Sequence, residues 1–327
     1  MADASGATPQ VTVVAATRNR RDLLARLIAG FEAQRGAPPF EVVLVDDAST
    51  DDTDAVLRDL AGSARVPVTA LRQPSRRGPG PARNRGWRTG TAPLVLFTDD
   101  DCVPHPDWVA TLAGALGRVD LAQGCTVPAP DQLANTGTFS RTLEVREATG
   151  FFQTCNMGFR RDALEAAGGF DEAFNHPAGE DTDLALRCLG QGRTFEFCAA
   201  AVVEHDVRPS SLVASVRDTW RWQGVVGVVK KHPDVVGRLV GSRWFWKPTH
   251  PRFLLALAGL PFLALGGRGL VVAVAAAAPY AWWRLVRDPA APGRWARVRF
   301  LPYVVCIDAG EVVAMAVGSV RYRRLYL

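Results

Sequence analysis

Three consecutive carboxylates, Asp99, Asp100 and Asp101, come directly after the sequence LVLFT at residues 94–98. Like charges this close together repel one another, and the repulsion grows as the local dielectric constant falls. Such a cluster is stable at the end of a buried strand where a bound cation or a helix N-terminus compensates its charge. The choice between these two explanations depends on what surrounds the cluster.

The elements that would position this cluster follow from the pattern of apolar residues. Near-continuous apolar runs predict strands, and the segments between them, with apolar residues at helical spacing, predict helices. Strands are expected at residues 11–16, 41–47, 66–71 and 93–98, and helices at residues 21–34 and 48–61, the second one capped by Ser49 or Thr50. This alternation is typical of an α/β protein with a mostly parallel, open sheet flanked by helices.

Other polar residues follow two of these strands. Arg18 and Asn19 come after the first strand, and Asp46 and Asp47 end the second. The carboxyl ends of parallel strands share one edge of a sheet, and ligands bind there. Each aspartate alone could simply cap the next helix, and this alternative stays open. Three polar clusters at one edge nevertheless favour a divalent cation with oxygen ligands, which would in turn bind a diphosphate.

The charge of the chain is divided unequally along its 327 residues. Residues 1–207 contain 20 Lys and Arg against 28 Asp and Glu, whereas residues 208–327 contain 18 against 5. The second part also holds all four tyrosines and seven of the nine tryptophans. Its basic residues alternate with long aliphatic stretches rather than with isolated stacking aromatics, which argues against a nucleic acid partner.

The cysteines and the N-terminus bear on the compartment. The six cysteines are scattered without a C-x-x-C pair, which predicts reduced thiols in a cytoplasmic protein. The N-terminal sequence MADASGATPQ has neither a basic nor an apolar region of the kind that makes a secretory signal.

Six sequence blocks occur together in a characteristic order and spacing: TRNR, VLVDDASTDDT, GPGPARNRG, FTDDDCVPHPDW, NMGFRRDALEAAGGFDEAF and GEDTDLALR. In these blocks the chain resembles the family 2 glycosyltransferases with the GT-A fold, over about residues 10–232. Any one block is weak evidence, and the specificity lies in their agreement. The resemblance implies a Rossmann-like α/β fold and an enzyme that moves a sugar from a nucleotide diphosphate to an acceptor with inversion at the anomeric carbon.

The resemblance implies roles on the nucleotide side of the site. Thr17, Arg18 and Asn19 would line the nucleotide pocket, and Asp46 or Asp47 would accept a hydrogen bond from the base. The glycine-rich block at residues 78–86 does not match a dinucleotide-binding fingerprint, because it lacks the G-x-G-x-x-G spacing and does not directly follow a predicted strand.

The resemblance also implies a metal and diphosphate site. Arg83 would pair with phosphate or stack on the base. The DDD run supplies the D-x-D motif: Asp99 and Asp100 would face the nucleotide sugar, and Asp101, together with Asp99, would hold a divalent metal, Mn²⁺ or Mg²⁺. His205 would complete the metal shell, and imidazole suits Mn²⁺ better than Mg²⁺. A surface histidine in a turn is the alternative for His205.

The acceptor side is expected near residues 179–192. An inverting transfer needs a carboxylate that takes the proton from the attacking hydroxyl, and by resemblance this is Asp181, with Glu180 beside it. The alternative is that these acidic residues only cap and charge a helix N-terminus. Asn156 could contact a sugar or a phosphate, although packing explains it equally well. The chain contains Arg221-Trp222 but no Q-x-x-R-W block, which favours non-processive addition of one sugar.

The C-terminal part predicts association with a membrane. The apolar runs at 253–265 and 269–283 are each shorter than the about 20 residues that a spanning helix needs. The run at 300–320 is long enough but carries Asp308 and Glu311, which are costly in lipid. Flanking Arg, Trp and Tyr residues are typical of the membrane–water interface. We expect a tail that lies in or dips into the cytoplasmic leaflet, with a tight hairpin through 253–283 as the main variant and a soluble helical cap as the alternative.

These inferences divide the chain into a flexible N-terminus (1–9), a GT-A catalytic domain (10–209), an amphipathic helical linker (210–252) and a membrane-associated, apolar and basic helical tail (253–327). The leading hypothesis is a metal-dependent inverting glycosyltransferase at the cytoplasmic face of the cell membrane. UDP-sugars are favoured as donors, with dTDP- or GDP-sugars possible, and the acceptor would be a sugar, a lipid-linked saccharide or a small molecule.

Two other functions remain as alternatives. A nucleotidyltransferase usually carries a glycine-rich loop directly after the first strand, where this chain reads TRNRRD. A catalytically inactive, membrane-anchored nucleotide-sugar binder would not need Glu180 and Asp181 opposite its metal site.

Overall fold

The computed structural model describes residues 8–135, 140–174, 177–287 and 294–327. Of the N-terminal segment expected to be flexible, residues 1–7 lie outside the described part of the chain. The chain divides into two compact units, one up to Ser210 and one from Ser211 onward.

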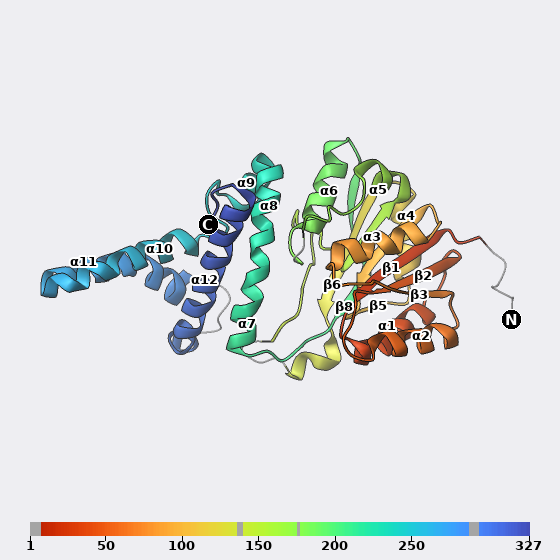
Figure 1. Ribbon diagram of the computed structural model, residues 1–327, viewed down its shortest axis with the longest axis horizontal. Helices are drawn as coiled ribbons and strands as arrows, with labels where there is room; N and C mark the ends of the chain where they lie inside the picture. Colours follow the sequence, from red (N-terminus) through yellow and green to blue (C-terminus); the bar gives the residue numbers. More distant parts are fainter. Residues whose placement is uncertain (1–7, 136–139, 175–176, 288–293) are drawn as a thin grey trace. The chain divides into compact units, whose positions relative to one another are not determined.

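The first unit alternates strands and helices (Figure 1). Its strands are β1 (Val11–Thr17), β2 (Phe40–Asp46), β3 (Val68–Arg72), β4 (Leu94–Asp99), β5 (Cys102–Pro104), β6 (Leu121–Pro128), β7 (Asn156–Arg160) and β8 (Phe195–His205). Its helices are α1 (Arg21–Glu32), α2 (Thr53–Ser63), α3 (Pro79–Thr89), α4 (Trp108–Leu116), α5 (Arg161–Ala167) and α6 (Glu180–Gly190), with a 3₁₀ segment η1 (Pro130–Asn135).

The eight strands form one open sheet in the order β3-β2-β1-β4-β7-β6-β8-β5. Strands β1 to β4 pair in parallel, as do β6 and β8, whereas β7 runs antiparallel to both of its neighbours and β5 antiparallel to β8. The predicted α/β fold with an open sheet between helices is confirmed, and the sheet is more mixed than predicted. Thr17 pairs with Asp46 and Ala16 with Asp99, so the carboxyl ends of β1, β2 and β4 are level.

Alternate residues of the strands pack into two cores on the two faces of the sheet. Val13 and Leu44 belong to a cluster built with residues of α1, α2 and α4, whereas Val45 packs with α3. A Cβ atom at Gly86 of α3 would come within 2.4 Å of the Val14 Cγ1 atom, so glycine is what allows α3 to lie this close to β1. Figure 1 shows α1 and α2 on one side of these strands and α3 on the other.

The predicted N-cap of the second helix is wrong. Helix α2 begins at Thr53 with Asp52 at the N-cap position, and neither Ser49 nor Thr50 caps it. The Ser49 hydroxyl donates instead to the buried carboxylate of Asp46. A buried carboxylate competes strongly for a nearby hydroxyl because its charge needs hydrogen-bond donors.

Asn156, which begins β7, holds three elements of the first unit together. Its Oδ1 accepts a hydrogen bond from the Trp108 indole (2.8 Å), and its Nδ2 donates to the carbonyls of Cys125 (2.8 Å) and Ala201 (2.9 Å). The side chain is fully buried. Asn156 is therefore part of the core, which favours the packing explanation over contact with a substrate.

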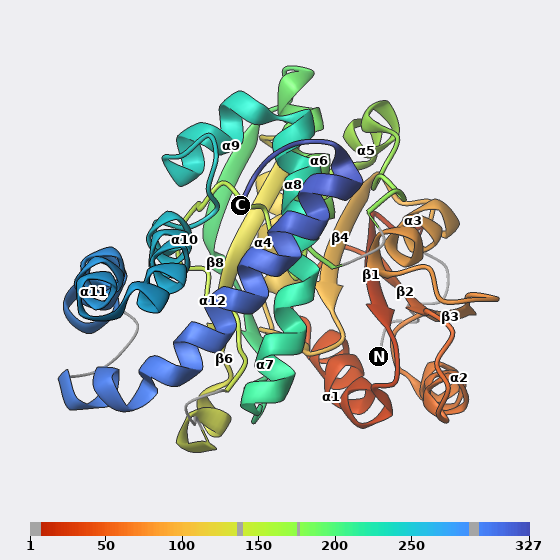
Figure 2. The same ribbon diagram turned by 60° about the vertical axis from the view of Figure 1, so that its left-hand side comes forward.

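The second unit is helical (Figure 2). It consists of α7 (Leu212–Asp218), the 3₁₀ segment η2 (Thr219–Trp222), α8 (Gln223–Lys231), α9 (Pro233–Val240), α10 (Thr249–Gly259), the 3₁₀ segment η3 (Leu260–Leu265), α11 (Gly266–Trp282), the π-helical segment η4 (Trp283–Arg287) and α12 (Arg294–Tyr322). Helix α12 lies alongside α8, where Gly318 meets the backbone of Gln223. Two segments are long and apolar enough to cross a membrane by length and composition, Thr249–Arg287 and Trp295–Tyr322.

Replacing Asn156 by Ala should destabilise the first unit. The substitution leaves an indole N–H and two carbonyls buried without their partner, which should lower the free energy of unfolding by about 2–4 kcal/mol. Chemical denaturation of the purified chain measures this. Arg160→Ala, at the exposed end of the same strand, is the control and should change stability by less than about 1 kcal/mol. Equal effects of the two substitutions would contradict a structural role for Asn156.

Candidate active site

The polar residues predicted to form a site meet at the carboxyl edge of the sheet. Thr17 ends β1, Asp46 ends β2, and Asp99 ends β4. The chain turns directly from Asp99 through the next two aspartates into β5, where Cys102 pairs with His205 at the end of β8. The short connection explains why the carboxylate cluster and the histidine lie together although they are far apart in the sequence.

The carboxylates of Asp100 and Asp101 both accept hydrogen bonds from other side chains. The Thr17 hydroxyl donates to Asp100 Oδ2 (2.8 Å). Asp101 Oδ2 accepts from Arg20 Nη1 (3.4 Å) and from Arg208 Nη2 (3.0 Å). Two guanidinium groups therefore partly neutralise Asp101, and that of Arg20 also lies 4.0 Å from Asp100 Oδ1.

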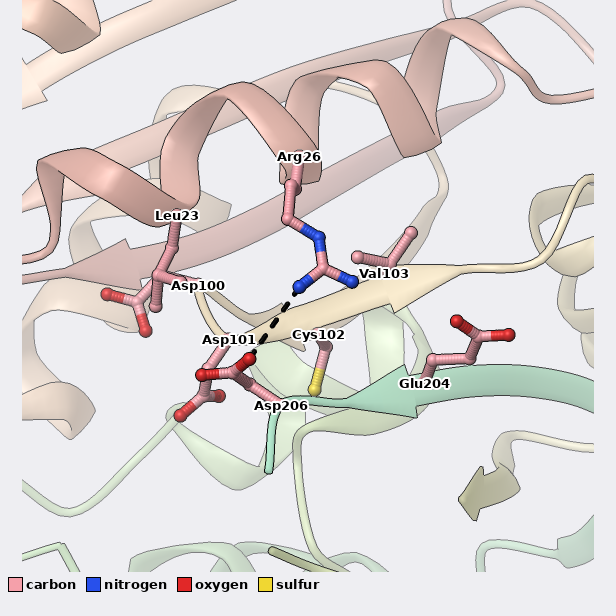
Figure 3. A pocket seen from close by; sticks show the side chains of 8 residues that line it. All are labelled: Leu23, Arg26, Asp100, Asp101, Cys102, Val103, Glu204 and Asp206. Carbon is pink, nitrogen blue, oxygen red and sulfur yellow. Dashed lines mark ion pairs between the residues drawn. The ribbon is translucent and has the colours of Figure 1, made fainter. Parts of the chain in front are cut away.

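A small pocket opens beside this cluster (Figure 3). It is lined by Leu23, Arg26, Asp100, Asp101, Cys102, Val103, Glu204 and Asp206. Arg26 reaches across it toward Asp206, with 3.7 Å between Nη1 and Oδ1. Four of the eight lining residues are acidic, so the pocket favours a positively charged occupant.

The possible ligand atoms around Asp101 fit a divalent cation. His205 Nδ1 lies 2.9 Å from the carbonyl oxygen of Asp206 and is placed to donate to it. Such a bond leaves Nε2 as the free ligand atom, and Nε2 faces Asp101 Oδ1 at 3.7 Å. Cys102 also lies within ligand distance of this pair. Its hydrogen bond with Cys155 and its burial raise the pKa of the Cys102 thiol well above its usual range, so it stays a thiol and is a poor ligand.

Excess negative charge also characterises this edge. Burial and the neighbouring Asp101 raise the pKa of Asp100 to about 7, and burial raises the pKa of Asp101 as well. Carboxylates in this state gain more from a cation than exposed carboxylates do, because the dielectric screening around them is weak. Carboxylate and imidazole ligands together suit Mn²⁺ or Mg²⁺.

Arg83 links the carboxylate run to the acidic residues of α6. Its Nη2 donates to Asp99 Oδ1 (2.7 Å), and its Nη1 lies 3.3 Å from both Glu180 Oε1 and Asp181 Oδ1. The side chain is 6% exposed, and its guanidinium lies over the Phe170 ring at 5.7 Å. One buried cation thus faces three carboxylates, and these three come from opposite sides of the predicted site.

Thr154 holds Asp181 from the other side. Its hydroxyl donates to Asp181 Oδ1 (2.7 Å), and its backbone N–H donates to Asp181 Oδ2 (3.1 Å). Thr154 lies just before β7 and is fully buried. The two donors fix the orientation of the carboxylate and stabilise its charged form.

The environments of Glu180 and Asp181 differ although the residues are adjacent. Burial raises the pKa of both carboxyls. Glu180 reaches a pKa of about 8 through burial and the nearby charge of Asp181, and its Oε2 has no hydrogen-bond partner among the described residues. For Asp181, Arg83 and Thr154 oppose the effect of burial. Asp181 is therefore the better candidate for an ionised base, and Glu180 the residue that more readily holds a proton.

Asp46 and Asp47 are engaged by the protein itself. Asp46 accepts from Ser49 and from Arg72 (2.8 Å to Nη1), and it is fully buried. Asp47 accepts the backbone N–H groups of Arg77 and Gly78, both at 2.8 Å. These bonds tie the end of β2 to the loop before α3. A carboxylate has more acceptor sites than Asp47 uses, whereas those of Asp46 are filled.

Arg18 and Asn19 follow β1 at the same edge. Asn19 adopts a left-handed backbone conformation with φ of 53°. Its Oδ1 accepts the Thr50 N–H (2.9 Å), and its own N–H donates to Ser49 Oγ (2.9 Å). Arg18 Nε is buried without a hydrogen-bond partner among the described residues, which leaves it available to a ligand.

Three residues of this arrangement were not predicted from the sequence: Arg20, Thr154 and Arg208. Arg20 stands in the TRNR block and Arg208 three residues after His205, so both lay next to predicted residues. Thr154 belongs to the stretch QTCN, which carries no pattern that distinguishes it from any polar segment before a strand.

The comparison with protein families decides which class of protein has this arrangement. The model described as "Glycosyl transferase family 2" matches residues 12–168, and that described as "Glycosyl transferase family group 2" matches residues 94–286, more than half of the chain. This chain belongs to the family 2 glycosyltransferases. The predicted family is thereby confirmed, and the matched ranges contain both the carboxylate run and the acidic start of α6.

Two glycosyltransferases are among the related sequences. This chain is 28% identical over 339 residues to the pre-mycofactocin glycosyltransferase of Mycobacterium tuberculosis. The alignment covers 97% of this chain and 69% of the relative. The chain is 27% identical over 294 residues to the validoxylamine A glucosyltransferase of Streptomyces hygroscopicus subsp. limoneus, which covers 76% of this chain and 62% of the relative.

Two solved structures share the fold of this glycosyltransferase. A mannosyltransferase from Pyrobaculum calidifontis in complex with GDP-Man and Mn2+ superposes with a TM-score of 0.59 at 22% identity, covering 97% of this chain and 88% of that one. S. aureus TarS in complex with UDP-GlcNAc gives a TM-score of 0.53 at 15% identity, covering 97% and 93%. At these identities the similarity establishes the GT-A fold.

The raised pKa of Glu180 predicts how stability depends on pH. The folded glycosyltransferase binds the Glu180 proton more tightly than the unfolded chain does, so this group stabilises the fold at low pH. That contribution is lost as the pH rises from about 4.5 to about 8. Glu180→Gln removes the ionisation and should raise stability by on the order of 2 kcal/mol at pH 8.5 relative to the wild type.

Thermal unfolding of both proteins in EDTA between pH 5 and pH 8.5 measures this effect. The gain from Glu180→Gln should be small at pH 5 and increase with pH. Glu165, which is exposed on α5, is replaced by Gln as the matched control. A gain that does not depend on pH would show that Glu180 is not protonated in the folded protein.

Proposed function

We propose that the protein is a metal-dependent, inverting and non-processive glycosyltransferase that uses a nucleotide-diphosphate sugar. The observation that supports this most directly is the position of Arg83, whose guanidinium contacts Asp99 on one side and Glu180 and Asp181 on the other. A donor-binding group and a candidate base are thus held within the reach of one side chain. A transfer reaction needs both around a single reacting carbon.

The donor would bind at the carboxyl edge of the sheet. Thr17, Arg18 and Asn19 would line the nucleotide pocket, and Asp47 has the acceptor capacity to receive a hydrogen bond from the base. Asp99 and Asp100 would face the ribose and the sugar. Asp101 and His205, with Asp99, would hold Mn²⁺ or Mg²⁺, which when bound neutralises charge on the leaving diphosphate.

The base would be Asp181. Its ionised carboxylate accepts the proton of the acceptor hydroxyl, while the hydroxyl oxygen forms a bond to the anomeric carbon. The bond between that carbon and the diphosphate oxygen breaks, and the diphosphate leaves with the electron pair. Attack opposite to the leaving group inverts the anomeric carbon. Thr154 keeps the carboxylate oriented, and Arg83 keeps it charged.

UDP-sugars are proposed as donors, with GDP- and dTDP-sugars as the alternatives; the two structural neighbours carry GDP-Man and UDP-GlcNAc. The acceptor would be a sugar, a lipid-linked saccharide or a small molecule. Residues 10–209 would form the catalytic domain and residues 210–252 the linker. Residues 253–327 would associate with the cytoplasmic face of the cell membrane, for which two apolar helical segments give support.

Nucleoside diphosphates should stabilise the protein when a divalent metal is present. A thermal-shift titration with UDP, GDP and dTDP, each with Mn²⁺, with Mg²⁺ or with EDTA, identifies the nucleobase and the metal dependence together. One diphosphate should raise the melting temperature, and EDTA or Asp101→Ala should abolish the increase. Asp206→Ala is the matched control, because Asp206 lies in the same pocket but is not a proposed ligand. If no diphosphate raises the melting temperature with either metal, the proposal fails.

Thr154 provides a second test, which concerns Asp181 as the catalytic base. The donor is a sugar nucleotide that carries the nucleobase identified in the thermal-shift titration, and release of its diphosphate measures turnover. Asp181→Asn should lower kcat by about 10²–10⁴-fold. Thr154→Val, which removes the hydroxyl at constant shape, should lower kcat by about 10–100-fold. Thr154→Ser should restore most of the activity, and KM for the donor should stay the same in all three variants. A loss through KM alone would contradict the assignment of the base.

A further inference from the structure

Helices α10 and α11 form an antiparallel hairpin with its apex at Gly266. Near the apex, a Cβ atom on Gly269 would lie 1.7 Å from the carbonyl oxygen of Phe262. Further from the apex, a Cβ atom on Gly259 would lie 2.7 Å from the Cβ atom of Ala276. The two glycines allow the helix backbones to approach closely, as small residues do between helices in membranes.

The same pairing continues to the open end of the hairpin. The rings of Phe253 and Tyr280 lie 5.3 Å apart, and the Arg252 guanidinium lies 4.4 Å from the centre of the Trp283 ring. The open end thus carries an arginine stacked on a tryptophan, whereas the rest of the hairpin is apolar apart from Arg268 at the apex.

The surface of this hairpin is apolar and exposed. The most apolar 18-residue window of Thr249–Arg287 has a mean hydropathy of 1.8, and only 6% of that window is buried. Leu260, Leu265, Val271 and Val274 are between 53% and 69% exposed. A continuous apolar surface of this extent indicates an interaction with an apolar partner.

We propose that the hairpin Thr249–Arg287 inserts into a lipid bilayer along its axis, with both ends on one side and the apex near the opposite headgroups. A helix that lies flat on a membrane needs a polar face. Helix α11 carries one charged residue, Arg268, and no polar face. A helix that is apolar all round belongs inside an apolar phase.

The length of the hairpin matches the thickness of a bilayer. The 17 residues of α11 extend about 25 Å at 1.5 Å per residue. The hydrocarbon core is about 30 Å thick, so the hairpin reaches beyond one leaflet. Arg268 would be costly at the bilayer centre, but at the apex its long side chain can reach the far headgroups. Arg252, Trp283 and Arg287 at the open end match the near interface.

The partners of the two carboxylates of α12 support this depth of insertion for the hairpin. Glu311 accepts from Lys247 Nζ (2.6 Å) and lies 3.2 Å from His250 Nε2. Asp308 accepts from Tyr280 and Arg284 at the open end of the hairpin. Both carboxylates therefore lie at the level of the interface and are neutralised within the unit, so they need neither a metal ion nor a place in the hydrocarbon.

Fluorescent probes around α11 test this inference in the full chain. Cysteines are introduced one at a time at Val271, Val272 and Val274, in a Cys198→Ser, Cys306→Ser background that keeps only the four buried native cysteines, and are labelled with an environment-sensitive fluorophore such as NBD. These positions point in different directions around the helix, and each is exposed in the protein. Ser63→Cys, on the surface of α2, is the control. Vesicles of POPC and POPG at a 3:1 ratio are the probe surface.

Insertion along the axis should shift the emission of all three α11 probes to the blue and protect them from dithionite, while the Ser63 probe stays accessible. A shift at only one or two positions would show a hairpin lying flat and overturn the inference. Vesicle binding without any shift would show that the hairpin is covered by protein, including a second copy, and would also overturn it.

The inference rests on the membrane association within the proposed function and not on the transfer reaction. If the chain does not sediment with vesicles at all, membrane association fails together with this inference, whereas diphosphate binding remains testable separately. Val271→Asp with Val274→Asp should weaken sedimentation at least about tenfold, because charges enter hydrocarbon poorly. Val213→Asp, an exposed apolar position outside the hairpin, should have little effect. Both variants should keep the Asp101-dependent stabilisation by diphosphate.

Discussion

The buried guanidinium of Arg83 is the interaction on which the geometry of the site depends. Three carboxylates meet around it, and each would repel the others if the cation were absent. Removing the cation from such a cluster leaves uncompensated negative charge in a place that water hardly reaches. The sheet can therefore bring Asp99 and Asp181 together only because α3 delivers Arg83 between them, and α3 can do so only because Gly86 lets it approach β1 closely.

The two groups of carboxylates are compensated in different ways. Around Asp101 the positive charge comes from Arg20 and Arg208, both of which are partly exposed. Side chains of this kind can move away when a stronger cation arrives. Arg83 is buried, and its contacts are set by the packing of α3 against Phe170. We infer that the surroundings of Asp101 adapt to ligands, whereas those of Asp181 are preorganised.

Much of this arrangement could be predicted from the sequence, for physical reasons. The strands before Asp46 and Asp99 are uniformly apolar, so their ends and the shared edge follow from hydrophobic pattern and parallel pairing. The residue types at that edge indicate the chemistry. The family follows from six blocks in order, and the comparisons confirm it.

Other features depend on contacts that no local pattern shows. β7 runs antiparallel inside the sheet, and an antiparallel strand has the same apolar pattern as a parallel one. Thr154 donates a hydrogen bond to Asp181, which is 27 positions away in the sequence, and neither propensity nor spacing can show such a contact. Ser49 was expected to cap α2, but a buried carboxylate three residues earlier takes its hydroxyl. Asn156 is a polar residue whose buried partners come from distant segments.

The antiparallel strand β7 has a consequence for how such enzymes diversify. Thr98 at the end of β4 pairs with Asn156, and its hydroxyl donates to the carbonyl of Cys155 (3.0 Å), next to Thr154. The support of the candidate base is therefore built into the same ladder as the carboxylate run. Shifting that ladder by one residue would displace them by about 3.3 Å and abolish their alignment. New acceptor preferences are consequently expected to evolve in the connections between strands, while the distance from donor to base is inherited unchanged.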